Sequence, residues 1–245
     1  MKKLGLLGKS IGYSFSRNYF SDKFKNEGLA NIFIYENYEI DSIEKFSDIF
    51  KSNPDLVGLN VTIPYKEAVI PFLDELSENA RQIGAVNTIK ITPEGKLIGY
   101  NTDYFGFLQS LKPLLKKHHT KALLLGTGGA AKAVAYGLNE IGIDSKFVSR
   151  QSGENCITYD ELTNEVFQEC QIIINCTPLG TFPKIELFPD IPYHFLTQNH
   201  IAFDLIYNPE KTEFLKKAEN KGAVIKNGYE MLVFQAEKAW KIWNN

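Results

Sequence analysis

Polar residues that could transfer protons or bind a substrate follow apolar runs in the first half of the chain. Thr62 and Lys66 stand just after one such run, Asn87 lies in a segment of small residues, and Asp103 follows a third run. A lone lysine or aspartate is most often a surface charge. Several polar residues that each follow an apolar run instead indicate convergence on one site.

Two serines near the start of the chain could hold a carboxylate. Ser14 and Ser16 flank Phe15, and in an extended segment both hydroxyls would face the same side. The alternatives are a plain turn, or Ser16 as the cap of the helix that follows. On these residues alone, the alternatives are favoured.

A glycine-rich segment in the second half fits the pattern G-x-G-x-x-[G/A], which binds dinucleotide pyrophosphates. It follows the apolar run 121–125 and precedes a predicted helix. Gly126 would permit the tight turn, Gly128 the close approach of the backbone to pyrophosphate, and Ala131 close helix–strand packing. The helix N-terminus would offer N–H groups to the phosphates. Isolated glycine matches are weak, but the strand–turn–helix context favours dinucleotide binding over a turn without a ligand.

The residues after the second strand of this unit indicate whether the cofactor is NAD or NADP. An NAD site usually has an acid there, about 20 residues beyond the glycines. At that position this chain has Ser149 and Arg150, and neither Asp nor Glu. Arg150 offers a planar cation for a 2′-phosphate, with Ser149 and Ser152 as hydroxyl donors, unless it is a solvated surface charge. Together with the missing acid, this segment predicts NADP(H).

The order of apolar runs and turn residues predicts an α/β fold with parallel strand pairs and two domains. Strands are expected at 3–7, 32–35, 56–61, 121–125, 146–148, 172–175, 201–205 and 223–225, a hairpin at 89–91 with 97–100, and helices at 17–27, 43–51, 105–117 and 229–243, with a helical stretch after Pro64. The chain has no Gly/Ser-rich linker, so we expect a short junction near 103–106 and a return near 226–229. Thr177 follows one of these strands, at the kind of sheet edge where ligands bind, although its loop could be a plain turn.

Composition excludes several classes of protein and site. A formal net charge of −2 gives no electrostatic reason for a nucleic acid or anionic membrane partner. Three cysteines without CxxC spacing and four histidines without ligand spacing predict neither a disulfide framework nor a metal site. The first residues lack a long apolar core, and no apolar stretch is long enough to span a bilayer. We therefore expect a cytoplasmic protein.

Taken together, the ordered motifs resemble those of the shikimate dehydrogenase family from the first strand to the last helix. The matching segments are Ser14-Phe-Ser16, Asn60-Val-Thr-Ile-Pro-Tyr-Lys66, Ile83-Gly-Ala-Val-Asn-Thr88, Asn101-Thr-Asp103, the glycine loop, Asp204-Leu-Ile-Tyr-Asn-Pro209 and Gly228-Tyr-Glu-Met-Leu-Val-Phe-Gln235. Each motif is weak alone, whereas the ordered set is specific. Three positions depart from the family pattern: Arg17 to Phe20 replace its Pro and His, Thr127 replaces Ala in the glycine loop, and Thr181 stands where Met is common.

The resemblance implies a reversible, NADPH-dependent reduction of 3-dehydroshikimate to shikimate, on the pathway to chorismate and aromatic amino acids. It implies a substrate-binding catalytic domain, 1–103 plus 228–245, and a Rossmann-type NADP-binding domain, 104–227, with the C-terminal helix returning to the first domain. It assigns catalysis to Lys66 and Asp103. The substrate-binding residues would be Ser14, Ser16, Thr62, Asn87, Tyr207 and Gln235. The cofactor-binding residues would be Gly126, Thr127, Gly128, Gly129, Ala130, Ser149, Arg150, Thr177 and Gly228.

In this interpretation, hydride passes from NADPH to the ketone carbon and a protein group protonates the developing alkoxide. Lys66 could donate that proton, and Asp103 could hold Lys66 and bind a substrate hydroxyl, so we treat them as a coupled pair. Ser14 and Ser16 would bind the ring carboxylate. The partners are then small molecules, and the oligomeric state, monomer or homodimer, stays open. The alternatives are a quinate/shikimate dehydrogenase that uses NAD, a non-catalytic dinucleotide sensor, and a two-domain dehydrogenase acting on a folate carbon unit.

Overall fold

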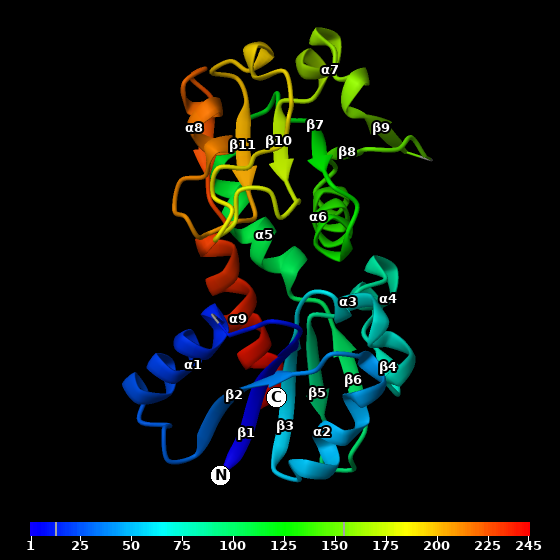
Figure 1. Ribbon diagram of the computed structural model, residues 1–245, viewed down its shortest axis with the longest axis vertical. Helices are drawn as coiled ribbons and strands as arrows, with labels where there is room; N and C mark the ends of the chain where they lie inside the picture. Colours follow the sequence, from blue (N-terminus) through cyan, green and yellow to red (C-terminus); the bar gives the residue numbers. More distant parts are fainter. Residues whose placement is uncertain (13, 154) are drawn as a thin grey trace. The chain divides into compact units, whose positions relative to one another are not determined.

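The computed structural model describes residues 1–12, 14–153 and 155–245. The chain folds into two compact units. Unit 1 comprises Met1–Thr102 with Ala236–Asn245, and unit 2 comprises Asp103–Gln235. Both are α/β, and each is built on one six-stranded sheet (Figure 1).

The sheet of unit 1 has the strand order β2-β1-β3-β5-β6-β4. Its elements are β1 (Lys2–Gly8), α1 (Phe15–Asn26), β2 (Phe33–Glu39), α2 (Phe46–Ser52), β3 (Leu56–Val61), α3 (Tyr65–Ala68), β4 (Glu75–Leu76), α4 (Glu78–Ile83), β5 (Thr88–Ile91) and β6 (Leu97–Tyr100). The pairs β1–β2, β1–β3 and β4–β6 are parallel. The pairs β3–β5 and β5–β6 are antiparallel, so the predicted hairpin is confirmed. The sheet is therefore mostly parallel with an antiparallel insertion.

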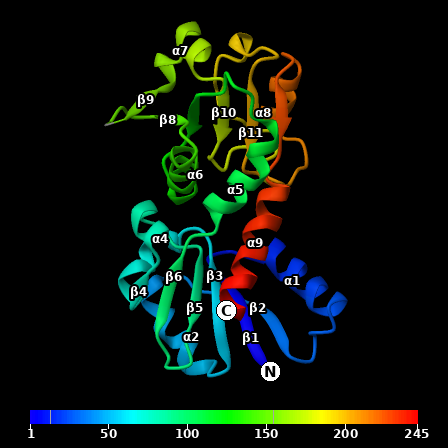
Figure 2. The ribbon, with the colours of Figure 1, turned by 180° about the vertical axis from the view of Figure 1, so that it is seen from behind.

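The C-terminal end of α9 (Tyr229–Asn244) packs in unit 1 beside α1 (Figure 2). Trp243 is buried, and its indole N–H donates to the carbonyl of Ile89 at 2.9 Å. A Cβ added to Gly58 on β3 would lie 2.3 Å from the Trp243 indole nitrogen, so a side chain there would displace the ring. The end of the C-terminal helix is thus part of the core of unit 1, in keeping with the return to the first domain that the resemblance implies.

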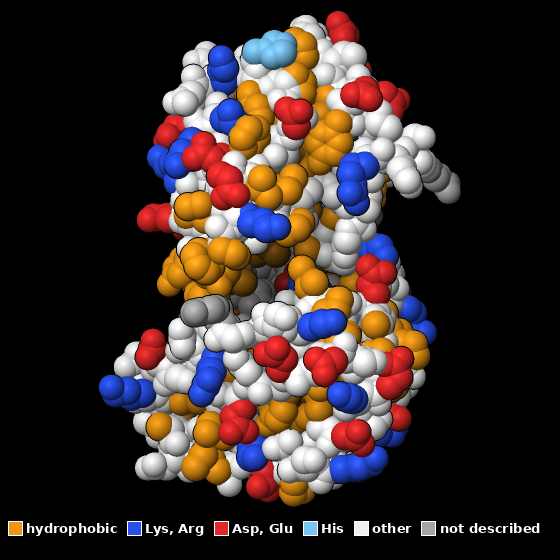
Figure 3. All heavy atoms as spheres, viewed as in Figure 1, with side chains coloured by type: hydrophobic (Ala, Val, Ile, Leu, Met, Phe, Trp, Pro, Cys, Tyr) orange, Lys and Arg blue, Asp and Glu red, His pale blue; other side chains and the backbone are white. Residues whose placement is uncertain are grey.

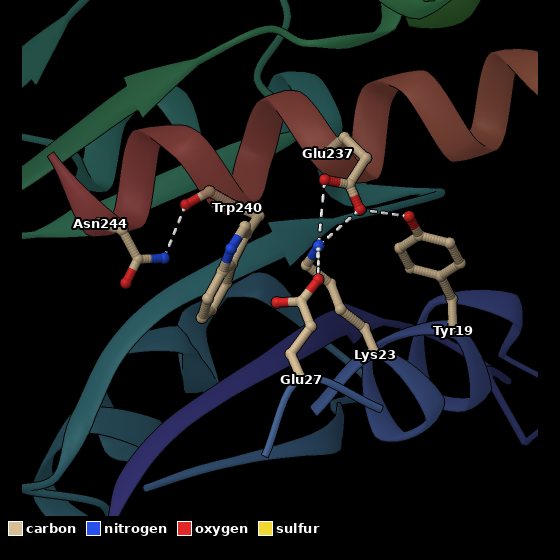
Figure 4. Close-up of polar contacts among 6 residues, drawn as sticks. All are labelled: Tyr19, Lys23, Glu27, Glu237, Trp240 and Asn244. Carbon is tan, nitrogen blue, oxygen red and sulfur yellow. Dashed lines mark hydrogen bonds and ion pairs between the residues drawn. The ribbon is translucent and has the colours of Figure 1, made fainter. Parts of the chain in front are cut away.

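A half-buried polar cluster also joins α9 to α1 (Figure 4). The Lys23 ammonium lies 2.9 Å from a carboxylate oxygen of Glu237 and 2.7 Å from one of Glu27. The Tyr19 hydroxyl donates to the same Glu237 carboxylate. Burial lowers the pKa of Lys23, but its bonds to the two glutamates outweigh burial and raise it. The cluster therefore fixes the helix that begins directly after Ser14.

Unit 2 has an all-parallel sheet in the order β12-β11-β10-β7-β8-β9. Its strands are β7 (Lys121–Leu125), β8 (Asp144–Ser149), β9 (Cys156–Thr158), β10 (Ile172–Asn175), β11 (Ile201–Asp204) and β12 (Val224–Lys226), and its helices are α5 (Asp103–Leu111), α6 (Gly129–Glu140), α7 (Asn164–Glu169), α8 (Glu213–Glu219) and the start of α9. Counted along the unit, this is the Rossmann order 3-2-1-4-5-6 read from the other edge.

Alternate residues of the unit 2 strands enter two different apolar clusters. Leu123 and Leu125 pack with residues of α7 and α8, whereas Ala122 and Leu124 pack with residues of α5 and α6. Since successive side chains of a strand point to opposite faces, the sheet lies between two helical layers. This explains why its strands read as continuous apolar runs in the sequence.

The long apolar elements match their predicted positions, and short polar elements were missed. The helix expected at 105–117 was too long, because α5 ends at Leu111 and a 3-10 turn with Pro113 follows. The helix expected at 43–51 begins as a 3-10 turn before α2. The elements not predicted are β4, α4, β9, α7 and α8, each of seven residues or fewer. Elements of this length carry little hydrophobic periodicity.

On the face drawn in Figure 3, acidic and basic side chains are interspersed over both units, and they form no patch of one charge sign. Within the described residues, no helix combines the length and apolar character needed to cross a membrane. The same residues contain no group of three or more His, Cys, Asp or Glu placed to hold a metal ion.

Two buried histidines occupy the edge of the unit 2 sheet where its strands begin. His200 accepts from the Thr197 N–H at 3.0 Å through Nδ1, and its Nε2 lies 2.9 Å from the carbonyl of Phe167. His119 accepts from the Lys116 N–H in the same way. Burial lowers the pKa of both rings below 6.5. A proton on Nδ1 would oppose the backbone N–H, so both rings are neutral in the fold.

We predict that the free energy of unfolding decreases as the pH falls below 6.5. In that range the histidines are protonated in the unfolded chain but stay neutral in the folded chain, because their pKa values are lowered in the fold. Each histidine contributes at most about 1.4 kcal/mol per pH unit in that window. Urea unfolding at pH 7.5, 6.5 and 5.5 should show a flatter pH dependence for His200→Asn, whose amide oxygen keeps the acceptor. The exposed control His194→Asn should follow the wild type, and an unchanged slope in His200→Asn would contradict the assignment.

Candidate active site

In unit 1, the candidate residues gather where β3 ends. The Val61 N–H donates to the carbonyl of Asn87 at 2.8 Å, and the Val86 N–H donates to the carbonyl of Lys66 at 2.7 Å. These bonds tie the segment of Asn87 to the strand end that carries Thr62 and the short helix that carries Lys66. The structure therefore brings Thr62, Lys66 and Asn87 together.

A buried network leads from this edge towards Ser16. The Tyr35 hydroxyl, on β2, donates to the Asn60 amide oxygen at 2.7 Å. The Asn60 amide nitrogen donates to the Asn87 carbonyl and to the Thr88 hydroxyl, at 3.3 and 3.2 Å. Burial raises the pKa of Tyr35, and a hydrogen bond with Ser16 partly opposes this. Ser16 is thus linked to the strand end through buried polar side chains.

The two serines at the start of α1 have different surroundings. Ser14 is the N-cap of α1, and its hydroxyl accepts from the Arg17 N–H at 3.2 Å. Ser16 is buried and faces Tyr35. The capping alternative therefore falls on Ser14 and not on Ser16. The capping bond uses one lone pair of Ser14 and leaves its hydroxyl proton available to an anion.

Asn87 also fixes the segment that leads into Asp103. Its amide oxygen accepts from the Thr102 N–H at 2.7 Å, and its amide nitrogen donates to the Thr102 hydroxyl at 3.0 Å. Asn101 donates to the carbonyl of Ala85 at 2.9 Å. Residues 101 and 102 are therefore pinned to the segment of Asn87. Asp103, the next residue, is buried at the start of α5.

In unit 2, the strand order reverses between β7 and β10, and the glycine loop lies at this switch point. Gly126 has φ +109°, which only glycine adopts readily, and a Cβ there would lie 3.3 Å from the Thr177 methyl carbon. Gly128 is the exposed N-cap of α6, and a Cβ there would meet nothing within 4 Å. The loop thus offers an open surface at a helix N-terminus. Thr127 is exposed, Gly129 and Ala130 are half-buried, and Ala131 is buried against the strand.

Ser149 ends β8 beside this loop, and Arg150 follows it as an exposed side chain. Since β7 and β8 are parallel neighbours, their carboxyl ends lie at the same edge. The Arg150 charge also lowers the pKa of Tyr159, which burial otherwise raises. The described residues at the end of β8 include no acid, in keeping with the sequence.

Thr177 is held by a buried side chain of β10. Asn175 accepts from both the N–H and the hydroxyl of Thr177, at 3.0 and 2.6 Å, through one amide oxygen. Its amide nitrogen donates to the Asp204 carboxylate at 3.1 Å. Because the Thr177 proton points to Asn175 and the Leu179 N–H donates to the hydroxyl oxygen at 3.3 Å, Thr177 can offer a ligand only its remaining lone pair. It suits a donor such as a ribose hydroxyl or a carboxamide N–H more than a phosphate oxygen.

The remaining candidates also lie in unit 2, after β11 and β12. Tyr207 is half-buried, and burial raises its pKa. Gly228 donates its N–H to the carbonyl of Ile206, and a Cβ there would lie 2.2 Å from the Leu205 carbonyl oxygen. Gln235 is buried in α9 next to Gly106.

Other residues were missed although a signal existed. Asn60 interrupts an apolar strand, and a buried amide requires hydrogen-bond partners, so it could have indicated the network with Tyr35 and Thr88. The same reasoning applies to Asn175 and Asp204, each the last residue of an apolar strand.

Comparisons with known proteins agree with this geometry. Residues 6–89 match the model of the shikimate dehydrogenase substrate binding domain. The shikimate dehydrogenase (NADP(+)) of Caldicellulosiruptor saccharolyticus is 40% identical over 265 aligned residues, which cover 99% of this chain and 92% of the relative. The chain belongs to the shikimate dehydrogenase family.

Solved structures of the shikimate dehydrogenase family share the complete fold. The shikimate 5-dehydrogenase of Thermus thermophilus, in complex with NADP(H) and shikimate, is 30% identical with a TM-score of 0.86, covering 99% of this chain and 93% of that one. The quinate dehydrogenase of Corynebacterium glutamicum, in complex with NAD, is 27% identical with the same TM-score and coverage. The Rossmann-type assignment of unit 2 is thereby confirmed.

We predict that Gly126→Ala weakens NADPH binding by at least about tenfold, since alanine at φ +109° is strained by about 1–3 kcal/mol and its methyl meets Thr177. Fluorescence titration with NADPH measures the effect. Gly142→Ala is the matched control, because Gly142 also has a positive φ, +72°, but lies beyond the other end of α6 with nothing near its Cβ. Equal weakening of NADPH binding in both variants would show that backbone strain alone causes the effect. It would contradict the assignment of the glycine loop to NADPH binding.

Proposed function

We propose that this chain is a shikimate dehydrogenase that reduces 3-dehydroshikimate to shikimate with NADPH, reversibly, in the biosynthesis of chorismate and aromatic amino acids. The observation that carries the proposal is the meeting of Thr62, Lys66 and Asn87 at the end of β3, with Ser16 joined to them through Tyr35 and Asn60. This edge offers hydroxyl, amide and ammonium groups to a small polyhydroxylated acid.

The dinucleotide fits unit 2 at the switch point. Gly128 and the first turn of α6 would face the pyrophosphate, because a Cβ added to Gly128 would meet nothing within 4 Å and the helix begins there. Arg150, with Ser149, would bind the adenosine 2′-phosphate, which supports NADP(H) over NAD(H). Thr177 and Gly228 would lie along the nicotinamide half. When bound, the cofactor supplies or accepts the hydride.

The protein's own contribution to the chemistry is orientation and proton transfer. Ser14 and Ser16 would donate to the ring carboxylate, and Thr62, Asn87, Tyr207 and Gln235 would bind the ring hydroxyls. Lys66 would place positive charge beside the ketone oxygen and donate a proton as alkoxide forms. Asp103, preceded by the pinned residues Asn101 and Thr102, would orient Lys66 as the second member of the pair.

The domain roles, compartment and assembly follow the same proposal. Residues 1–103 with 228–245 would form the substrate-binding catalytic domain, and 104–227 the NADP-binding domain. The match of residues 6–89 to the substrate-binding family model supports the first assignment. Three free cysteines suit a reducing compartment, and we propose the cytoplasm. The partners are shikimate, 3-dehydroshikimate and NADP(H), in a monomer or homodimer.

Steady-state turnover with shikimate or quinate, each with NADP+ or NAD+, tests the proposal. We expect kcat/KM to be highest by far for shikimate with NADP+. Comparable values with quinate or NAD+ would instead assign the chain to the quinate/shikimate branch. Dinucleotide binding without turnover of any pair would favour a sensor.

We predict that Lys66→Ala lowers kcat by about 10²–10⁴-fold, the usual contribution of a positioned proton donor. The KM for shikimate should change far less, because Lys66 acts mainly in the transition state. Lys45→Ala, which removes an exposed lysine of the same unit, is the control. Turnover near that of the wild type in Lys66→Ala would exclude Lys66 from the chemical step.

A further inference from the structure

Asp204 is a buried carboxyl group at the carboxyl end of β11, and neither binding nor proton transfer as described above uses it. We propose that Asp204 tunes the preference of the site for the two oxidation states of the cofactor. As a carboxylate close to the nicotinamide half of the site, it favours the cationic ring of NADP+ over the neutral ring of NADPH. The inference rests on the proposed use of NADP(H).

The strand order places Asp204 on the nicotinamide side of the switch point. The glycine loop after β7 would hold the pyrophosphate, and Arg150 after β8 would hold the adenosine phosphate. The nicotinamide half must then extend the other way, over β10 and β11. Asp204 is paired in register with Asn175, the last residue of β10. At about 4.8 Å between strands, it lies about 10 Å from the end of β7.

Hydrogen bonds connect Asp204, through Asn175, to the loop that carries Thr177. One carboxylate oxygen accepts from Asn175 at 3.1 Å and from the Ile206 N–H at 3.0 Å, and the other accepts from the Thr212 hydroxyl at 2.6 Å. Asn175 in turn holds Thr177. The path from Asp204 to the loop beside Gly126 therefore consists of buried polar groups with no water-exposed step at Asn175 or Asp204.

The charge of Asp204 is finely balanced. Burial raises its pKa to about 7, although the bonds from Thr212, Ile206 and Asn175 each lower it. Among the described residues, no cation contributes to this balance. The titratable groups that feel its charge are Cys176, at the end of β10, and Tyr193, and the pKa of each is raised. Both remain neutral at pH 6–8.5, so Asp204 is the group among these three that changes charge in this range.

A cation bound near Asp204 must favour its ionised form. NADP+ would therefore release a proton from Asp204 on binding, and NADPH would release less. By reciprocity, ionisation of Asp204 strengthens the binding of NADP+ relative to that of NADPH. Unit charges about 10 Å apart, the scale that two strand spacings set, change an equilibrium in a partly buried site by on the order of tenfold.

The test is the ratio of the dissociation constants of NADP+ and NADPH, measured without substrate between pH 6 and 8.5. NADPH fluorescence gives one constant and displacement by NADP+ the other. The 2′-phosphate and pyrophosphate are common to both forms, so their titration cancels in the ratio. We expect the ratio for the wild type to fall by about tenfold as the pH rises through 7. A constant ratio would overturn the inference.

Asp204→Asn removes the charge but keeps an amide oxygen for Asn175 and Ile206 and an N–H for Thr212. Its ratio should stay at the wild-type value of pH 6 at every pH. Asp190→Asn, which changes an exposed aspartate of unit 2, should follow the wild type. Equal weakening of both nucleotides with the pH dependence retained would make Asp204 merely structural and would also overturn the inference.

A third variant probes the titrating group itself. Thr212→Val removes a hydrogen bond that lowers the pKa of Asp204, so the midpoint of the ratio should move to higher pH with the same amplitude. An unmoved midpoint would show that another group titrates. Failure of the proposed use of NADP(H) looks different from all these outcomes, because neither nucleotide would then bind.

Discussion

Buried amide and hydroxyl side chains at strand ends must find hydrogen-bond partners, since an unpaired buried polar group costs about 1–3 kcal/mol. In unit 1, Asn60 meets this demand through Tyr35 and Thr88, and Asn87 meets it through Thr102. These bonds fix the backbone at the point where β3, β5 and β6 present their polar residues. The positions of Thr62, Lys66 and the segment leading into Asp103 depend on them.

Unit 2 uses the same constraint for a different ligand. The Asn175 amide donates a hydrogen bond to the Asp204 carboxylate across β10 and β11. The Asn175 amide oxygen accepts from the Thr177 hydroxyl and so sets its orientation. The glycine loop needs no such side chains, because it would bind through its backbone. A rigid polar layer on one side of the switch point thus complements an open backbone surface on the other. The division suits a cofactor with a phosphate end and a redox-active end.

The sequence was sufficient for the parts of the fold that long apolar runs specify. β3, β7 and β10 were predicted with their observed bounds, and the hairpin of β5 with β6 was predicted in its place. Strand alternation and the glycine loop predicted an α/β unit that binds a dinucleotide, and the family resemblance implied that it is Rossmann-type. The elements that escaped, such as α4 and α8, are short and depend on caps such as Ser77 and Thr212 rather than on periodicity.

The site was only partly predictable for a related reason. Spacing identified Lys66, Asn87 and Arg150, whose residue types indicate their chemistry. It did not identify Tyr35, which lies on another strand and contributes through a bond formed only by the folded sheet. The distinction between Ser14 as a helix cap and Ser16 as a buried hydroxyl likewise requires the helix start to be known.

Direct hydride transfer between the two ligands is the step on which the proposed function depends most. Incubation of the protein with 3-dehydroshikimate and NADPH that carries two deuterium atoms at C4 of the nicotinamide ring tests it, with the product analysed by mass spectrometry. We expect shikimate with one deuterium on the carbon that was the ketone. Unlabelled shikimate, or no product from a protein that binds both ligands, would contradict direct transfer.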